Sequence, residues 1–201
     1  MAKIDDGSFP VVTLNDEFIE KHSKCKDNQI LEAIRYDFKK SIGKIIRIEP
    51  LQKYKQILEL SLIGHQLTNI SALQNLTNLR TLNLSWNSLT TSALKPISKL
   101  TLLESITLNN NNIDKIPSDF SHLINLKVLR MGCNPIKDRG QFIKLKNNIN
   151  LMNLDFEGSN VFNSDDSILF CAFMLPQLTM LNRSFISLDF RKKAKERFER
   201  E

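Results

Sequence analysis

The residue types that could carry catalysis or bind a metal are present, but none stands in a spacing that supports such chemistry. His22, His65 and His122 are isolated in the sequence, and the six glycines are scattered, so there is no zinc-ligand motif and no phosphate-binding turn. The adjacent carboxylates Asp165 and Asp166 are explained more simply as helix-capping residues. The sequence therefore predicts a non-enzyme with no catalytic residue, no metal, no cofactor and no small-molecule substrate.

The cysteines also argue against chemistry. Cys25, Cys133 and Cys171 are odd in number and widely spaced, which fits free thiols in a reducing compartment better than a disulfide framework. A nucleophilic cysteine needs an activating base, and Cys133 has no such partner nearby in the sequence. We therefore expect a cytoplasmic protein with unreactive thiols.

Composition and charge narrow the class of protein further. The 201 residues are 41% hydrophobic and 25% charged, as in a globular domain. We identify no secretory signal and no stretch approaching the roughly 18 apolar residues of a membrane span. The net charge is +6, yet residues 56–125 carry four basic and four acidic residues. A neutral middle argues against a groove that binds nucleic-acid phosphates directly.

Five segments share the template L-x-x-L-x-L-x-x-N-x-L. They are ILELSLIGHQL from Ile57, LRTLNLSWNSL from Leu79, LESITLNNNNI from Leu103, LKVLRMGCNPI from Leu126 and LMNLDFEGSNV from Leu151. This is the leucine-rich-repeat pattern. It predicts an α/β solenoid with a curved parallel sheet on its concave side, short helical or 3₁₀ returns behind it, and helical caps at both ends.

The ninth template residue is an asparagine in the three middle copies, and we expect its amide to bond backbone groups in the turn. His65 and Ser159 replace it in the first and last copies. We expect the same structural role for His65, with a functional role as the alternative.

We divide the single predicted domain into an N-terminal helical cap over 1–44, repeats over 45–161 and a C-terminal helical cap over 162–201. Residues 15–41 have helical character, and a degenerate repeat with a poorly specified strand begins near Ile45. A helix capped by Ser164 or Asp165 follows the repeats and ends at Pro176. The charged tail presents a thin apolar stripe, Phe190, Ala194 and Phe198, that should dock on the array.

The repeats resemble the short, 22-residue type of leucine-rich repeat of a large intracellular family. That family includes the leucine-rich light chain of axonemal dynein, the repeat domain of tubulin-folding cofactor E, the spliceosomal A-prime protein and a regulatory subunit of type-one protein phosphatase. The ending is similar to the cap of the first three, L-P-x-L-x-x-L-D followed by a β-branched residue, Arg, Ala and an aromatic, although Asn182 replaces the usual Asp. The matching positions are Leu175, Pro176, Leu178, Leu181, Ile186, Arg191, Ala194 and Phe198.

The template also predicts the partner-binding face, because strand side chains alternate and the third, fifth and seventh residues of each copy point away from the core. The first four rows are small, neutral or apolar apart from Glu59 and one arginine, and the last row is acidic. The predicted residues are Glu59, Ser61, Ile63, Thr81, Asn83, Ser85, Trp86, Ser105, Thr107, Asn109, Val128, Arg130, Asn153, Asp155 and Glu157. The alternative is a solvated face without a ligand.

Trp86, the single tryptophan, stands at the eighth template position. We expect it at the edge of the concave face, partly exposed, as a binding hot spot; packing over neighbouring turns is the alternative.

The resemblance implies a non-enzymatic scaffold, and we predict a monomeric adaptor that binds another protein on its concave face. The chain ends favour a microtubule, dynein or cilium context. A ribonucleoprotein component holding an RNA-binding protein, including a nuclear one, and a phosphatase regulatory subunit are the alternatives. We expect the basic tail to be a solvated, salt-bridged helix, with contact to tubulin tails, RNA or membrane as the alternative.

Overall fold

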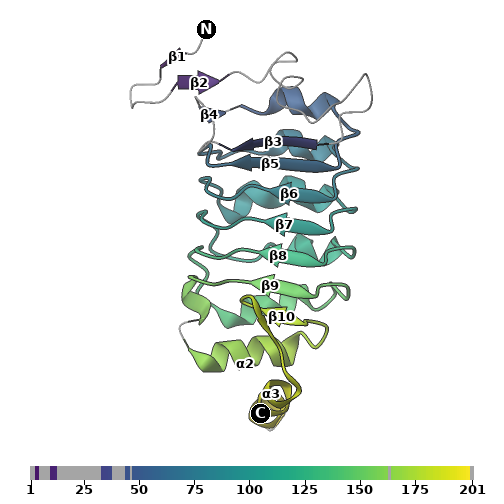
Figure 1. The fold of residues 1–201 in the computed structure, drawn as a ribbon, viewed down its shortest axis with the longest axis vertical. Coiled ribbons are helices and arrows are strands. Elements are labelled where there is room, and N and C mark those ends of the chain that lie inside the picture. The colour runs from purple at the N-terminus through teal and green to yellow at the C-terminus, as the bar shows by residue number, and fades with distance from the viewer. Residues whose placement is uncertain are drawn as a thin grey trace.

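Stacked parallel strands form the body of the protein, with short 3₁₀ helices behind them (Figure 1). The computed structural model describes residues 3–4, 10–12, 33–37, 44–45, 47–162 and 164–199. The main sheet has eight strands in the order β11-β10-β9-β8-β7-β6-β5-β3, all parallel except β11. Its strands are β3 (Ala33–Asp37), β5 (Glu59–Ile63), β6 (Thr81–Asn83), β7 (Ser105–Thr107), β8 (Val128–Arg130), β9 (Asn153–Asp155), β10 (Met180–Leu181) and β11 (Ser184–Phe185).

The strands follow the template because its two inward leucines need a neighbour to cover them. In β6, Leu82 is buried between the partly exposed Thr81 and Asn83, and β7 to β9 repeat this alternation at their first two residues. Leu82 pairs with Leu60 on one side and with Ile106 on the other. The predicted solenoid is therefore confirmed, with one leucine layer for each repeat.

The return segments are 3₁₀ helices because their apolar residues recur every third position. The backbone N–H of Leu73 donates to Ile70 O at 3.0 Å, that of Leu76 to Leu73 O at 2.9 Å, and that of Leu79 to Leu76 O at 3.0 Å. Each bond spans three residues, so one side of the return faces the core continuously. The returns are η2 (Glu49–Lys53), η3 (Ser71–Asn75), η4 (Thr91–Lys99), η5 (Ser118–His122), η6 (Arg139–Leu145) and η7 (Asn160–Phe162).

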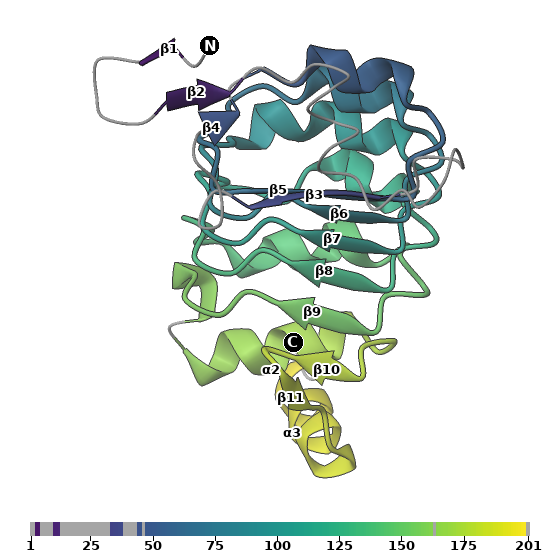
Figure 2. The same ribbon diagram turned by 45° about the horizontal axis from the view of Figure 1, so that its top comes forward.

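The N-terminal end differs from the sequence prediction. Residues 33–37, predicted within a helical cap, form strand β3, which pairs in parallel with β5 from Ala33–Glu59 to Asp37–Ile63. The strand of the degenerate repeat therefore precedes Ile45, where we expected that repeat to begin. Strands β1 (Lys3–Ile4), β2 (Pro10–Val12) and β4 (Lys44–Ile45) make a separate small sheet (Figure 2). The rest of the predicted helical region lies outside the described residues.

The C-terminal end carries the two predicted helices, α2 (Asp165–Met174) and α3 (Leu188–Phe198). Ser164 caps α2, since its side chain accepts from the N–H of Ser167. Ala194 and Phe198 of the predicted stripe are buried, and the Phe198 ring meets the Phe170 ring of α2 edge-on at 5.3 Å. The tail helix therefore docks on α2 and covers the end of the array.

A cluster of charges and rings joins the return η6 to both helices. The Arg139 guanidinium lies 4.8 Å from the centroid of the Phe170 ring and 5.5 Å from that of Phe198. Asp166 accepts hydrogen bonds from Arg139 and Arg197. Burial disfavours the Asp166 carboxylate, but the Arg139 hydrogen bond and the charges of both arginines together lower its pKa. This cluster fastens the cap to the last repeats.

Candidate protein-interaction face

The structure brings the predicted concave residues together on the sheet face opposite the returns. Register aligns them in columns: Thr81 pairs with Ser105 and then Val128, and Asn83 with Thr107 and then Arg130. Most of these side chains are partly exposed, and those of Trp86 and Glu157 are more than half exposed. The face is therefore a real surface of short side chains, over which another backbone can approach closely.

Two of the predicted residues are less accessible than expected. Ser85 is 6% exposed because its hydroxyl donates to Asn83 Oδ1 at 2.8 Å, and the same oxygen accepts from the Ser85 N–H. Asp155 is only 1% exposed. Both side chains shape local turns, so they are poor candidates for direct contact with a partner.

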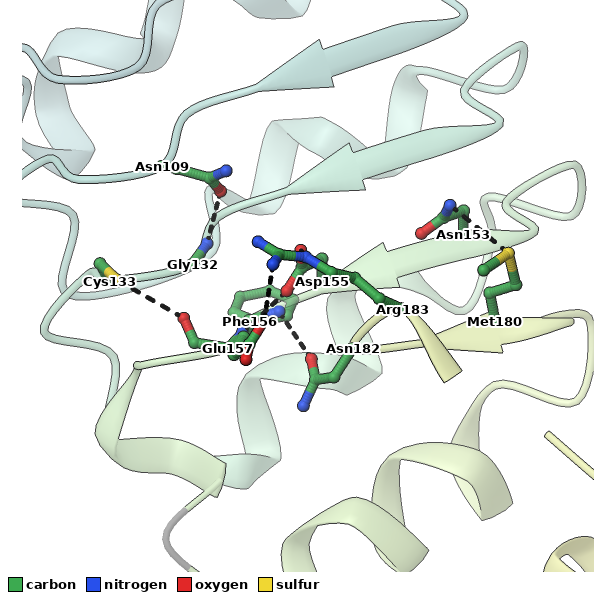
Figure 3. A network of polar contacts seen from close by, with 10 residues as sticks. All are labelled: Asn109, Gly132, Cys133, Asn153, Asp155, Phe156, Glu157, Met180, Asn182 and Arg183. Atoms are coloured by element: carbon green, nitrogen blue, oxygen red, sulfur yellow. Dashed lines mark hydrogen bonds and ion pairs between the residues drawn. The ribbon is translucent and has the colours of Figure 1, made fainter. Parts of the chain in front are cut away.

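An arginine from the cap pairs with both carboxylates of the predicted acidic last row (Figure 3). Arg183 Nε donates to Asp155 Oδ2 at 3.1 Å, and Arg183 Nη1 lies 3.2 Å from Glu157 Oε2. Asp155 Oδ1 accepts from the Glu157 N–H at 2.9 Å. The hydrogen bond with Asp155, followed by the charges of Asp155 and Glu157, raises the pKa of Arg183. Arg183 therefore compensates one of the two negative charges, and this end of the face stays weakly acidic.

Asn182 performs a backbone role at the junction of repeats and cap. Its Oδ1 accepts from the Phe156 N–H at 2.9 Å, and its own N–H donates to Leu154 O at 2.9 Å (Figure 3). An amide oxygen accepts such a bond as a carboxylate does. Asn182 therefore joins the cap to the backbone of the last repeat.

The eighth template position has a backbone conformation that the sequence analysis did not predict. Every copy is left-handed there: φ is +59° at Trp86, +56° at Asn110, +54° at Cys133, +83° at Gly64 and +76° at Gly158. Glycine adopts this region freely and asparagine tolerates it, whereas a bulky residue is strained in it. The glycines and the asparagine were the signal that could have revealed this turn.

Trp86 holds this strained turn with its side chain 55% exposed. Its N–H donates to Asn109 O at 2.9 Å, as the Gly64 N–H donates to Ser85 O, so the backbone is fixed by the next repeat. The predicted edge position is confirmed. The ring is therefore not buried filler, and it stands on a backbone conformation that a bulky residue rarely adopts.

The predicted asparagine ladder is confirmed beneath this rim. Asn87 Oδ1 accepts from the N–H groups of His65 and Leu67 at 3.1 and 2.9 Å, and its Nδ2 donates to Leu62 O and Leu84 O. His65 is fully buried, and its Nδ1 accepts from the Ile45 N–H at 3.2 Å. His65 is thus the ladder residue of the first copy, the structural role we expected.

A second asparagine ladder lies at the start of the strands and was missed. Asn78 Nδ2 donates to Lys55 O at 3.0 Å, Asn125 Nδ2 to Thr101 O at 3.0 Å, and Asn150 Nδ2 to Ile124 O at 2.8 Å. Each asparagine directly precedes the first leucine of its copy, and this recurrence was the available signal. Side-chain amides therefore join neighbouring repeats at both ends of the strands.

Metal-ligand clusters, cysteines and hollows are the features that bear on reactivity among the residues that the structure describes. These residues include no group of three or more His, Cys, Asp and Glu residues that could hold a metal ion. Burial raises the pKa of the Cys171 thiol. A hollow of about 340 Å³ between η4 and η5 contains Lys95, Lys115, Lys144 and Asp119 but no histidine or cysteine. No helix within the described ranges is long and apolar enough to cross a membrane.

Comparisons with known proteins agree on the fold. No family model and no curated protein matches the sequence. Among solved structures, internalin C2 of Listeria monocytogenes has a TM-score of 0.55 at 22% identity, over 68% of this chain and 59% of its own. A leucine-rich-repeat protein of Leptospira interrogans has a TM-score of 0.62 at 21% identity, over 75% of this chain and 36% of its own.

The plant peptide hormone receptor RGFR1, solved in complex with RGF2, has a TM-score of 0.54 at 23% identity, over 80% of this chain and 24% of its own. The chain thus spans about three fifths of internalin C2 and less of the other two. The protein has the leucine-rich-repeat fold, an α/β solenoid.

Proposed function

We propose that this protein is a non-enzymatic, monomeric adaptor that binds another protein on its concave face. The observation that carries the proposal is Trp86, a large, 55% exposed ring on a left-handed backbone at the rim of a face made of small neutral side chains. Tryptophan is enriched among the residues that dominate protein interfaces. The similar structure RGFR1 is a plant peptide hormone receptor solved in complex with RGF2, which supports a binding role for this fold.

Charge supports a protein partner over nucleic acid. Rows β6 to β8 carry one charged side chain, Arg130, and the last row keeps a net negative charge after Arg183 has paired with Asp155 and Glu157. Binding to a phosphate backbone draws on many cations in one track, which this face lacks in its described rows. A face of mostly short, uncharged side chains favours close packing against a segment of another protein.

A blocking variant tests the proposal. Ser105 lies in the middle of the face, so Ser105→Arg should abolish capture of the partner from a lysate and binding to the purified partner. Ser92→Arg places the same side chain on the exposed return η4 and should have no effect. Retention of binding by Ser105→Arg, or its loss in Ser92→Arg, would contradict the proposal.

The cellular context rests on the resemblance of the chain ends alone. We place the protein in the cytoplasm, with a microtubule, dynein or cilium setting first. The alternatives are a ribonucleoprotein component, which includes the nucleus, and a phosphatase regulatory subunit. Identification of captured proteins by mass spectrometry separates them: tubulin or dynein chains, spliceosomal proteins, or the phosphatase catalytic subunit. Capture of either alternative set without tubulin or dynein would refute the first setting.

A further inference from the structure

Arg130 stands out at the centre of the concave face because it is the one charged side chain in the rows of β6, β7 and β8. Its neighbours in register are Thr107 on β7 and Asp155 on β9. Asp155 does not pair with it, because Oδ2 accepts from Arg183 and Oδ1 from the Glu157 N–H. Within the described parts of the chain, the Arg130 guanidinium has no hydrogen-bond or ion-pair partner.

Two amide groups on the same face also keep donors for a ligand, Asn83 two strands from Arg130 and Asn109 just beyond β7. Asn83 Oδ1 accepts from Ser85, and Asn109 Oδ1 accepts from the Gly132 N–H at 2.8 Å. These bonds fix the orientation of both amides, and neither Nδ2 group donates to another described residue. The Nδ2 groups of Asn83 and Asn109 are therefore held ready to bond carbonyl oxygens of a bound backbone.

The positions of Trp86 and Arg130 set the length of a ligand that reaches both. Trp86 follows β6 and Arg130 ends β8, two strands away, or about 10 Å across the sheet. Three residues along the strand direction add about 10 Å more, so the diagonal is about 14 Å. An extended segment covers that distance in about four residues.

We propose that the partner presents an acidic side chain to Arg130 from an extended segment whose apolar residue, about four positions away, packs on Trp86. This inference rests on the proposed binding function. A guanidinium offers paired donors that match a carboxylate in a bidentate bond. One arginine without a second cation in the central rows matches a singly charged carboxylate better than a doubly charged phosphate.

Selection of peptides from a displayed random library tests this inference. With the unmodified protein, the enriched peptides should share an Asp or Glu and an aromatic or aliphatic residue three to five positions away. With Arg130→Gln the acidic preference should disappear, whereas Lys99→Gln, which removes a charge on the return side, should leave it unchanged. Urea unfolding of each variant verifies that the fold is intact.

A synthetic enriched peptide with an amidated C-terminus separates the contributions. Replacing its acid by the matching amide should weaken binding about tenfold or more for the unmodified protein and leave binding to Arg130→Gln unchanged. Enriched peptides without an acid, an acidic preference that survives in Arg130→Gln, or tighter binding of a phosphoserine version would each overturn the inference. Failure to enrich any peptide would also overturn the inference. The proposed function would fall as well only if Ser105→Arg still captured the partner.

Discussion

The left-handed turn at Trp86 predicts an unusual order of stability for two substitutions. Trp86→Ala and Trp86→Gly both remove the ring, so the loss of packing cancels in their difference. At a φ of +59°, a side chain with a Cβ costs about 1–2 kcal/mol, which glycine avoids. Glycine in turn lowers the free energy of unfolding by about 0.5–1 kcal/mol, because it gives the unfolded chain more conformational entropy. Trp86→Gly should therefore be more stable than Trp86→Ala by about 0.5–1 kcal/mol.

Equilibrium unfolding in urea measures this difference as a shift of the midpoint at constant slope. Thr101 provides the matched control, because it is exposed and is not among the residues with positive φ. There the alanine variant should be the more stable one. A Trp86→Ala protein as stable as Trp86→Gly would refute the left-handed backbone and the repeat register that places it.

Four further predictions concern the core, the turns and the cap. Leu108→Ala, at a fully buried position, should lower the free energy of unfolding by about 2–5 kcal/mol, and a loss under about 1 kcal/mol in a urea melt would contradict the register. Gly158→Ala should be destabilising, because the new Cβ would lie 2.7 Å from Cys133 Sγ at a φ of +76°; adding Cys133→Ala should restore part of the loss, and a single variant as stable as the unmodified protein would contradict the turn. Removal of residues 186–201 should expose α2 and cause aggregation in light scattering, whereas an equally stable monomer would refute the cap. The pKa of Asp166 is lowered in the folded state, so the carboxylate stabilises the fold fully above its ordinary pKa of 3.8, and this stabilisation is lost as the pH falls through the lowered pKa. Asp166→Asn should therefore reduce the dependence of the free energy of unfolding on pH in the acid range. An unchanged dependence would contradict the cluster.

The periodic parts of the fold followed from the sequence. Leucines at fixed spacing fixed the strands, apolar residues at every third position fixed the 3₁₀ returns, and Ser164 marked the start of α2. The strand at residues 33–37 was not predicted, because their sequence, AIRYD, lies in a charged stretch of helical character. These residues form a strand where they pair with the edge of β5, and such a long-range partner leaves no local signal.

The repeat template predicted which residues line the strands of the candidate face, but not how their charges pair, and their contact with a partner stays a prediction. Asp155 and Glu157 were read as an acidic row because Arg183 stands in the cap, outside the repeat template. Folding of the β10–β11 hairpin returns Arg183 to that row. Because Arg183 pairs with Asp155, Asp155 does not pair with Arg130, its neighbour in register. Sequence spacing predicts which residues share a face, not which of them pair.

Site-specific photo-crosslinking tests the central claim most directly. A benzophenone side chain would replace Thr107, at the centre of the concave face, or Ser92, on the return η4. After irradiation with the captured partner, we expect a covalent adduct of the two chains for the variant at Thr107 and none for the variant at Ser92. An adduct only at Ser92, or none at Thr107 while the partner stays bound, would contradict binding on the concave face.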